Sequence, residues 1–333
     1  MQDTPLWLTE ADVTSSIDLG GAIEALEDAL RAEAAGQADS MTKTHLMVGD
    51  NNAMHAIGGA LHTAGICGVK NWVNINGKSA TLLNVYSLED GRVLAVIEAT
   101  ALGQLRTAAM TGLGTKWMAP ADVSEMTIIG TGKQALPQVA ACAAVRPIKT
   151  VRVFSRTPEK RTALCELISQ ELTGLETVDC GSLEEAVEDV ALITLCTNAT
   201  EPFFFSRHAT AGAHINAVGA IVPKRVEFGD DLFPRCTDIA VDSVAGVQAM
   251  SREFIDYFGA GQSDWDRVQP LSARIGEEAV RTANADLTLF KAVGMGLSDL
   301  AVANRVLSIC SKSGAGHKLP ARNRKPLPLQ AAE

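Results

Sequence analysis

The feature that most constrains this fold is a glycine-rich turn at residues 129–135, where an apolar strand ends and a helix begins. The segment reads IGTGKQA, so Gly130, Gly132 and Ala135 form the pattern G-x-G-x-x-A. The first glycine permits a tight turn, the second lets the backbone approach a pyrophosphate, and the small third residue lets strand and helix pack closely. Free N–H groups and the helix dipole would hold the phosphates. The pattern predicts dinucleotide binding, and the other residues of this loop are Thr131, Lys133 and Gln134.

The segments around this turn predict two kinds of sheet. From Val123 onward, apolar strands such as TVRVFSR, ALITLC and AGAHINAVG alternate with helical segments, which is typical of a parallel sheet covered on both faces. The first 112 residues differ: an amphipathic helix over 18–35 precedes consecutive strands with a hairpin turn at 89–91, and a buried Ala-rich helix follows over 100–118. We therefore expect an α+β module followed by an α/β module.

Composition narrows the class of protein. A length of 333 residues predicts about two domains, and a formal net charge of −10 argues against nucleic acid as a partner. Seven cysteines without C-x-x-C spacing indicate reduced thiols, and the histidine and cysteine spacing predicts no metal site. We find no signal peptide and no apolar stretch of 18 residues, so we expect a cytoplasmic protein without a membrane partner. The basic, proline-containing segment 317–333 is expected to be a solvated end.

The end of the strand after the glycine-rich turn predicts the type of dinucleotide. A free ribose 2′-hydroxyl is usually bound by an Asp or Glu there, whereas a 2′-phosphate is bound by an Arg. Here the strand ends in Phe154, Ser155, Arg156 and Thr157, with a cation, two hydroxyls and no carboxylate. This predicts NADP(H) in preference to NAD(H). The alternative is that Arg156 is an ordinary solvated loop residue and that cofactor choice is loose.

Three cations stand within or beside apolar segments of the first module. They are Lys43, Lys70 and Arg106. Because a buried cation is costly unless it is paired, an anionic ligand such as a substrate carboxylate would explain them. Internal salt bridges with residues such as Glu98 are the alternative.

Six segments in register resemble one known family. They are LRTAA at 105–109, IGTGKQA at 129–135, FSRTPE at 154–159, ATEP at 199–202, HINAVGA at 214–220 and LFKAVGMGLSDLAVA at 289–303. In order and spacing this chain resembles the ornithine cyclodeaminase and mu-crystallin family from about Trp7 to Ser311. The resemblance implies a Rossmann-type domain at 113–303, inserted into an α+β substrate-binding and dimerisation domain at 1–112 plus 304–333, and it implies a homodimer.

The resemblance also implies roles for individual residues. Lys43 stands where the family has a basic residue, usually Arg, that binds the substrate carboxylate. A lysine is expected to bind that carboxylate with less bidentate character than an arginine does. Lys70 matches the family's substrate-binding lysine, and Arg106 matches the arginine that spans cofactor and substrate. Cofactor contacts would also come from Thr81, and from Thr197, Val218, Gly219 and Ala220 on the nicotinamide side, while Ala292 and Val293 would close the pocket.

One departure from the family pattern favours a particular activity. Ornithine cyclodeaminases have an acid where this chain has Ile221, which cannot accept a proton. We therefore expect an NADP-dependent reductase of small cyclic ketimine carboxylates, with Lys70 and Arg106 as the catalytic residues and Lys70 or water as proton donor. The alternatives are an alanine-type amino-acid dehydrogenase acting on an oxo acid, an ornithine cyclodeaminase, and a non-catalytic NADPH-binding or small-ligand-binding protein.

Overall fold

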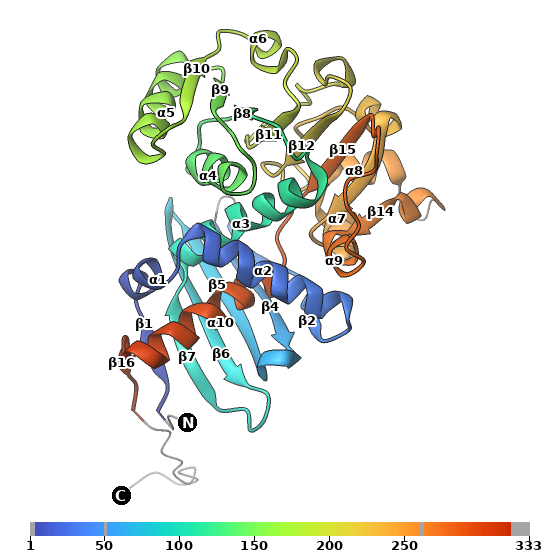
Figure 1. The fold of residues 1–333 in the computed structure, drawn as a ribbon. Coiled ribbons are helices and arrows are strands. Elements are labelled where there is room, and N and C mark those ends of the chain that lie inside the picture. The colour runs from blue at the N-terminus through green and yellow to red at the C-terminus, as the bar shows by residue number, and fades with distance from the viewer. Residues whose placement is uncertain (1–3, 50–51, 260–262, 321–333) are drawn as a thin grey trace, which may run out of the picture.

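The computed structural model describes residues 4–49, 52–259 and 263–320 and places two eight-stranded sheets in two lobes (Figure 1). This confirms the predicted fold class, a mixed α/β chain with a parallel sheet. The expected solvated end is described only as far as Pro320, and its remainder, 321–333, lies outside the described residues.

The first sheet is mainly antiparallel and has the order β16-β1-β7-β6-β5-β4-β2, with β3 paired to β4. The predicted hairpin turn joins β6 to β7, and β1 pairs with β7 in parallel. Its strands are β1 (Leu6–Leu8), β2 (Ala38–Ser40), β3 (Thr44–Val48), β4 (Asn52–Leu61), β5 (Ile66–Ile75), β6 (Lys78–Ser87), β7 (Val93–Glu98) and β16 (His317–Lys318). The short helices α1 (Glu10–Ser16) and η1 (His62–Ala64) belong to the same lobe.

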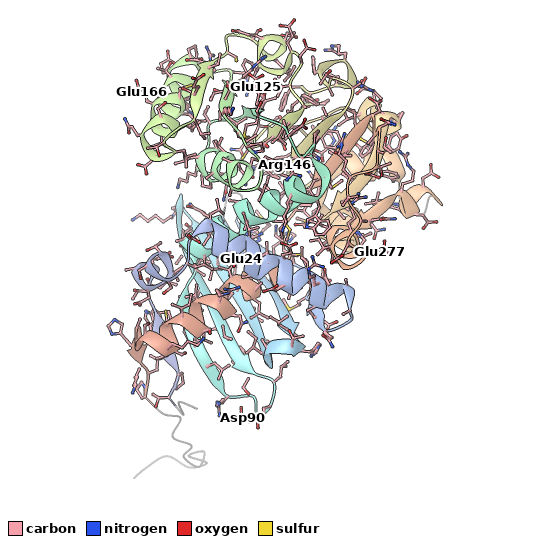
Figure 2. The ribbon with its side chains drawn as sticks, in the orientation of Figure 1. Glu24, Asp90, Glu125, Arg146, Glu166 and Glu277 are labelled. Carbon is pink, nitrogen blue, oxygen red and sulfur yellow. The ribbon has the colours of Figure 1, made fainter. Side chains whose placement is uncertain are left out.

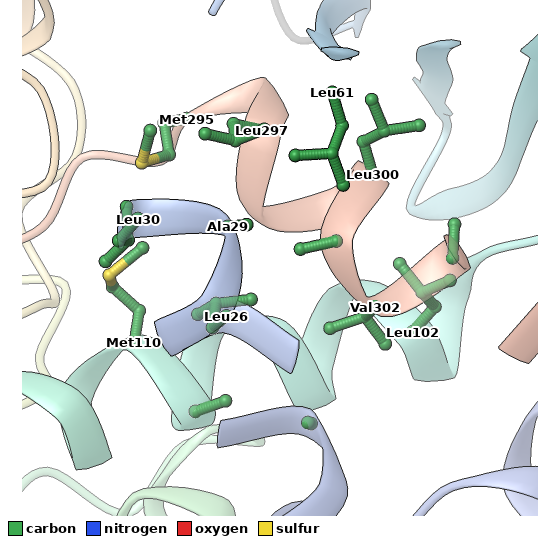
Figure 3. Packing of buried hydrophobic residues seen from close by; sticks show 14 of the residues in the cluster. Leu26, Ala29, Leu30, Leu61, Leu102, Met110, Met295, Leu297, Leu300 and Val302 are labelled. Carbon is green, nitrogen blue, oxygen red and sulfur yellow. The ribbon is translucent and has the colours of Figure 1, made fainter. Parts of the chain in front are cut away.

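Two helices from opposite ends of the chain cover one face of this sheet. Helix α2 (Leu19–Ala34) begins where Asp18 accepts a hydrogen bond from Gly21 N at 2.8 Å, and α10 (Gly296–Ser313) lies beside it. Leu26 and Leu30 of α2 and Leu300 and Val302 of α10 belong to one buried apolar cluster, and Figure 3 shows Leu300 beside Leu61 at the end of β4. A Cβ on Gly296 would lie only 2.0 Å from the carbonyl oxygen of Gly58, so α10 starts in direct contact with β4.

The second sheet is parallel throughout, in the order β10-β9-β8-β11-β12-β15-β13-β14. Its strands are β8 (Glu125–Ile129), β9 (Thr150–Phe154), β10 (Glu176–Asp179), β11 (Leu192–Leu195), β12 (Ala213–Ala217), β13 (Cys236–Val241), β14 (Val268–Pro270) and β15 (Leu287–Lys291). The connecting helices are α4 (Ala135–Val145), α5 (Pro158–Glu171), α6 (Leu183–Val187), η2 (Ser206–His208), η3 (Asp230–Arg235), α7 (Val244–Met250), α8 (Arg252–Phe258), η4 (Ser263–Arg267) and α9 (Leu271–Gly276). Its central strands β11 and β12 are buried along their whole length, as their continuous apolar sequences predict.

Helix α3 (Thr100–Met118) runs between the two lobes (Figure 1). Its last turn is held by Arg146 of the second lobe, labelled in Figure 2, whose guanidinium donates to the carbonyl oxygens of Lys116, Ala119 and Pro120. The expected domain boundaries at 112/113 and 303/304 each fall inside a continuous helix. The chain passes from the first sheet to the second through α3. It returns to the first sheet between Lys291 and Gly296, since α10 packs on that sheet from its first turn.

The acidic excess of the sequence appears on the surface. Glu24 on α2, Asp90 in the turn between β6 and β7, and Glu166 on α5 are exposed, and Figure 2 shows them at the outside of the molecule. All seven cysteines are free thiols, as their spacing predicts. Over the described residues, no helix is both long and apolar enough to span a membrane.

Candidate active site between the two sheets

The glycine-rich turn lies between β8 and α4, and its two glycines have different reasons to lack a side chain. Gly130 has a φ of +115°, and a Cβ there would lie 2.3 Å from the carbonyl oxygen of Cys196. Gly132 is different, because a Cβ there would meet no heavy atom within 4 Å. The free space over Gly132 is what a pyrophosphate needs in order to reach the backbone. The cap residue of α4, Gln134, makes no side-chain capping bond, so it leaves that helix end open to a ligand.

A cavity of about 640 Å³ opens beside this turn. The predicted cofactor residues that line it are Gly130, Thr131, Gly132, Ser155, Arg156, Thr157 and Thr197. Lys133 and Gln134 follow in the same turn without lining the cavity, and Val218, Gly219 and Ala220 follow the end of the neighbouring strand β12. A dinucleotide therefore fits this edge, as expected where ligands bind outside the carboxyl ends of parallel strands.

The corner of the cavity after β9 carries positive charge. The Ser155 hydroxyl accepts a hydrogen bond from Thr157 N at 3.4 Å, which shapes the turn that presents the exposed Arg156. Lys160, in the first turn of α5, lines the same cavity. Within the described ranges, neither Arg156 nor Lys160 forms a salt bridge, whereas Arg161 is paired with Asp179 at 2.6 Å. The cavity's one carboxylate, Glu201, lies on the loop after β11.

A buried carboxylate that the sequence analysis missed holds together the residues expected to line the nicotinamide. Glu227 accepts hydrogen bonds from Thr197 N at 2.6 Å and Oγ1 at 2.9 Å, from Gly219 N at 2.8 Å and from Ala220 N at 3.1 Å. A Cβ on Gly219 would lie 2.5 Å from Glu227 Oε1, so only glycine fits there. Burial raises the pKa of Glu227, and the charge of Lys291 opposes this shift. Glu227 thus joins the ends of β11 and β12.

Two further buried acids support the same edge. Glu253 accepts from Glu227 N at 3.1 Å and lies 3.4 Å from the Nζ of the fully buried Lys291. Asp242, directly after β13, accepts from Val293 N at 3.1 Å and from Gly294 N at 2.6 Å. These bonds fix the loop after β15 that contains the predicted residue Val293, with Ala292 buried next to it. A polar residue directly after an apolar strand was the available indication of Asp242.

The predicted cations Lys70 and Arg106 meet at a fourth acid that the sequence analysis missed, Asp299 on α10. Lys70 Nζ lies 2.7 Å and Arg106 Nε 3.1 Å from the same oxygen, Asp299 Oδ1. Asp299 is 1% exposed, and its second oxygen, Oδ2, has no hydrogen-bond partner among the described residues. Glu98, the partner considered from sequence, instead accepts from Glu10 N at 3.0 Å. An internal ion pair therefore exists for Lys70 and Arg106, with Asp299 in place of Glu98, and the anionic ligand stays a prediction.

Lys43 and Thr81 complete the predicted set. Lys43, half-buried between β2 and β3, lines a small cavity together with Val293, Gly294 and Met295. Burial lowers the pKa of Lys43, and the nearby charge of Arg106 lowers it further. Thr81 lies on β6 opposite Trp72 and lines neither this cavity nor the one beside the glycine-rich turn.

The arrangement provides positive charge for two anionic groups. In the parts of the chain that the structure covers, no three His, Cys, Asp or Glu side chains are grouped to hold a metal ion. The cations Lys43, Lys70 and Arg106 interact electrostatically within one region. A carboxylate there and a dinucleotide in the cavity after β8 would be held by separate sets of residues.

Comparisons with known proteins identify the relatives of this chain. Residues 4–313 match the model of the ornithine cyclodeaminase/mu-crystallin family. A Delta(1)-pyrroline-2-carboxylate reductase of Bacillus cereus is 32% identical over 249 residues, which are 72% of this chain and 74% of that protein. The structure of the Thermococcus litoralis Delta(1)-pyrroline-2-carboxylate reductase with NADH and L-proline has a TM-score of 0.86 at 26% identity, covering 94% of this chain and all of that one. An archaeal alanine dehydrogenase dimer with bound NAD has a TM-score of 0.86 at 25% identity, covering 95% and 99%.

Proposed function

Because the chain belongs to the ornithine cyclodeaminase/mu-crystallin family, we propose that it is an NADP-dependent reductase of small cyclic ketimine carboxylates. At the coarser level it is an oxidoreductase that reduces imines and uses a nicotinamide cofactor. Its substrates would be of the pyrroline- or piperideine-2-carboxylate type and its products cyclic amino acids. The observation that carries the proposal is the cluster of Lys70, Arg106 and Asp299, with Lys43 within electrostatic reach.

The residues of this cluster explain how the substrate would be held. Arg106 uses only its Nε for Asp299, so its terminal nitrogens remain for a carboxylate. Lys43 would add a second positive charge on the same carboxylate, and Lys70 would face the imine. A bound NADPH would supply the hydride, and the strand ends fastened by Glu227 would orient its nicotinamide ring. Catalysis would then rest on positioning and on preformed charge.

The preference for NADP is a separate part of the proposal. It is supported by Arg156 and Lys160 at the cavity and by the absence of an acid at the end of β9. An arginine fork matches the geometry of a phosphate group.

Other activities remain testable alternatives. The archaeal alanine dehydrogenase relative favours a check for open-chain reductive amination, which would depend on ammonia. Ornithine cyclodeamination is disfavoured, because this chain has Ile221 where ornithine cyclodeaminases have an acid. A non-catalytic NADPH-binding or small-ligand-binding protein would retain the nucleotide cavity without turnover.

We also propose a cytoplasmic homodimer. The archaeal alanine dehydrogenase relative is a dimer, and this chain exposes Leu46, Met47 and Met54 on the neighbouring strands β3 and β4. Exposed apolar side chains grouped on one sheet are typical of an interface. Analytical ultracentrifugation of the wild type and of Leu46→Asp tests the dimer.

The experiment that tests the activity is a panel followed by NADPH and NADH absorbance. Cyclic ketimine carboxylates, 2-oxo acids with and without ammonia, and ornithine are compared. We expect turnover with the cyclic ketimines, without added ammonia, and a higher kcat/KM with NADPH than with NADH. Ammonia-dependent turnover of oxo acids would indicate the dehydrogenase, and no turnover of any substrate would indicate the non-catalytic binding protein.

A further inference from the structure

We propose that Asp299 is a positioning residue that holds Lys70 and Arg106 in the site and keeps Lys70 available as the proton donor of the reduction. The proposal rests on the proposed function for its chemistry and names the donor that function leaves open. Asp299 belongs to α10, Lys70 to β5 and Arg106 to α3. Two cations from β5 and α3 therefore meet at a single carboxylate oxygen that α10 supplies.

The geometry leaves Lys70 little freedom. Its Nζ lies 2.7 Å from Asp299 Oδ1 and 5.0 Å from the centroid of the Trp72 ring, and the Lys70 side chain is only 5% exposed. A Cβ on Gly103 of α3 would lie 3.6 Å from this Nζ, so a larger side chain at Gly103 would crowd the amine. An ammonium has three donors and Asp299 occupies one of them, which leaves donors for a substrate nitrogen.

The charges around Lys70 explain why a carboxylate is needed there. Burial lowers the pKa of Lys70 to about 8, the charges of Arg106 and Lys43 lower it as well, and Asp299 counteracts them. Its partners across the sheet, Ile57 on β4 and Leu83 on β6, are apolar and contribute no charge. Without Asp299, Lys70 would stand beside two cations and lose its proton at a lower pH.

The proton balance of the step then closes. A bound reduced nicotinamide, as in the proposed function, would supply hydride to the imine carbon, and the C=N π bond would break towards nitrogen. That nitrogen takes a proton from Lys70 Nζ, so a C–H and an N–H bond form. Lys70 is left neutral and recovers its proton from solvent. Since only protonated Lys70 can act, kcat falls as pH rises through the pKa of Lys70.

The test measures the titration of Lys70 directly as well as through activity. The full-length wild type is labelled with trace acetic anhydride from pH 6 to pH 11, and acetylation of Lys70 is quantified by peptide mass spectrometry. The same series is run on Asp299→Asn and on Asp28→Asn. The second variant is a matched control, because Asp28 of α2 also pairs with a cation, on α10: it lies 3.8 Å from Arg305, and both side chains are exposed.

We expect the Lys70 labelling midpoint near pH 8 in the wild type and in Asp28→Asn. In Asp299→Asn it should move down by about one pH unit or more, with an equal shift in the alkaline limb of kcat. A wild-type midpoint near that of a free lysine, or an Asp299→Asn variant that loses kcat at every pH without a shift, would overturn the proposal. If Asp299→Asn does not fold, Asp299→Glu, which restores the charge, should keep the midpoint near 8, and a lowered midpoint would again overturn it.

Failure of this inference and failure of the proposed function give different results. A wild type that reduces no cyclic ketimine contradicts the function, while labelling still reports whether Asp299 controls Lys70. Normal turnover combined with an unshifted Lys70 titration contradicts only the role of Asp299.

Discussion

The two glycines of the nucleotide turn should respond to the same substitution in opposite ways. In Gly130→Ala the new methyl group would lie 2.3 Å from the carbonyl oxygen of Cys196, at a φ of +115°. The backbone strain costs about 1–2 kcal/mol and the overlap about 1–3 kcal/mol more, so the free energy of unfolding should fall by about 2–5 kcal/mol. In Gly132→Ala the methyl group would meet nothing within 4 Å, so stability should change by less than about 1 kcal/mol.

The effect on cofactor binding is a separate matter, because Gly132→Ala should weaken NADPH binding although it hardly changes stability. The methyl group of Gly132→Ala would enter the space through which a pyrophosphate reaches the backbone. A lost hydrogen bond to a charged group costs about 1.5–3 kcal/mol, which is about 10- to 150-fold in the Kd of NADPH. Urea unfolding gives the stability of both variants, and quenching of tryptophan fluorescence gives the Kd. The reasoning is refuted if Gly132→Ala binds NADPH like the wild type, or if Gly130→Ala unfolds at the wild-type urea concentration.

Three further predictions test the cofactor corner, a buried histidine and the aromatic core. Arg156→Ala should lower kcat/KM for NADPH by about 10-fold or more, while kcat/KM for NADH stays within about 2-fold. Lys312→Ala is the control, because it removes an exposed positive charge that does not line the cavity, and it should change neither value. Burial lowers the pKa of His214 to about 3, so its neutral form is favoured in the fold. The free energy of unfolding should therefore fall by about 1.4 kcal/mol per pH unit as pH drops from about 6.5 towards 3, and equal slopes for wild type and His214→Gln in urea titrations would contradict this. Phe233 is fully buried among Phe228, Phe254 and Phe258. Phe233→Ala should therefore lower the free energy of unfolding by about 3–5 kcal/mol, as measured by urea unfolding.

The parts of the fold that were predictable depend on local sequence. The glycine-rich turn and the helix over 100–118 are specified by residues close to one another in the chain, and each lies where the sequence predicts. The position of a domain boundary depends instead on which sheet a helix packs against, and the two expected boundaries lie inside α3 and α10. That choice is made by remote contacts such as the one between Gly296 and Gly58, which no periodicity in α10 reveals.

The missed site residues have the same origin. Asp299 lies within LFKAVGMGLSDLAVA, a segment used for the family resemblance, yet its partners Lys70 and Arg106 are 229 and 193 positions away. Glu227 likewise binds Thr197 and Gly219 from a position with no distinctive local pattern. Sequence reasoning found the cations because a charge in an apolar segment is conspicuous, and it missed the carboxylates because acids are common in this chain.

Helix α3 connects the two proposed binding sites, the carboxylate site at Asp299 and the cofactor site at the edge of the second sheet, and holds them at a fixed distance. Arg106, near its middle, is fixed to Asp299 of the first lobe, while Thr115, near its end, accepts a hydrogen bond from Asn216 of β12 at 2.9 Å. These two residues are nine positions apart, so the helix separates them by about 13.5 Å. β12 ends at Ala217, directly before the residues fastened by Glu227. A single helix therefore fixes the proposed carboxylate site relative to the proposed nicotinamide site, so we expect the hydride-transfer distance to depend on the packing of α3 as well as on the catalytic side chains.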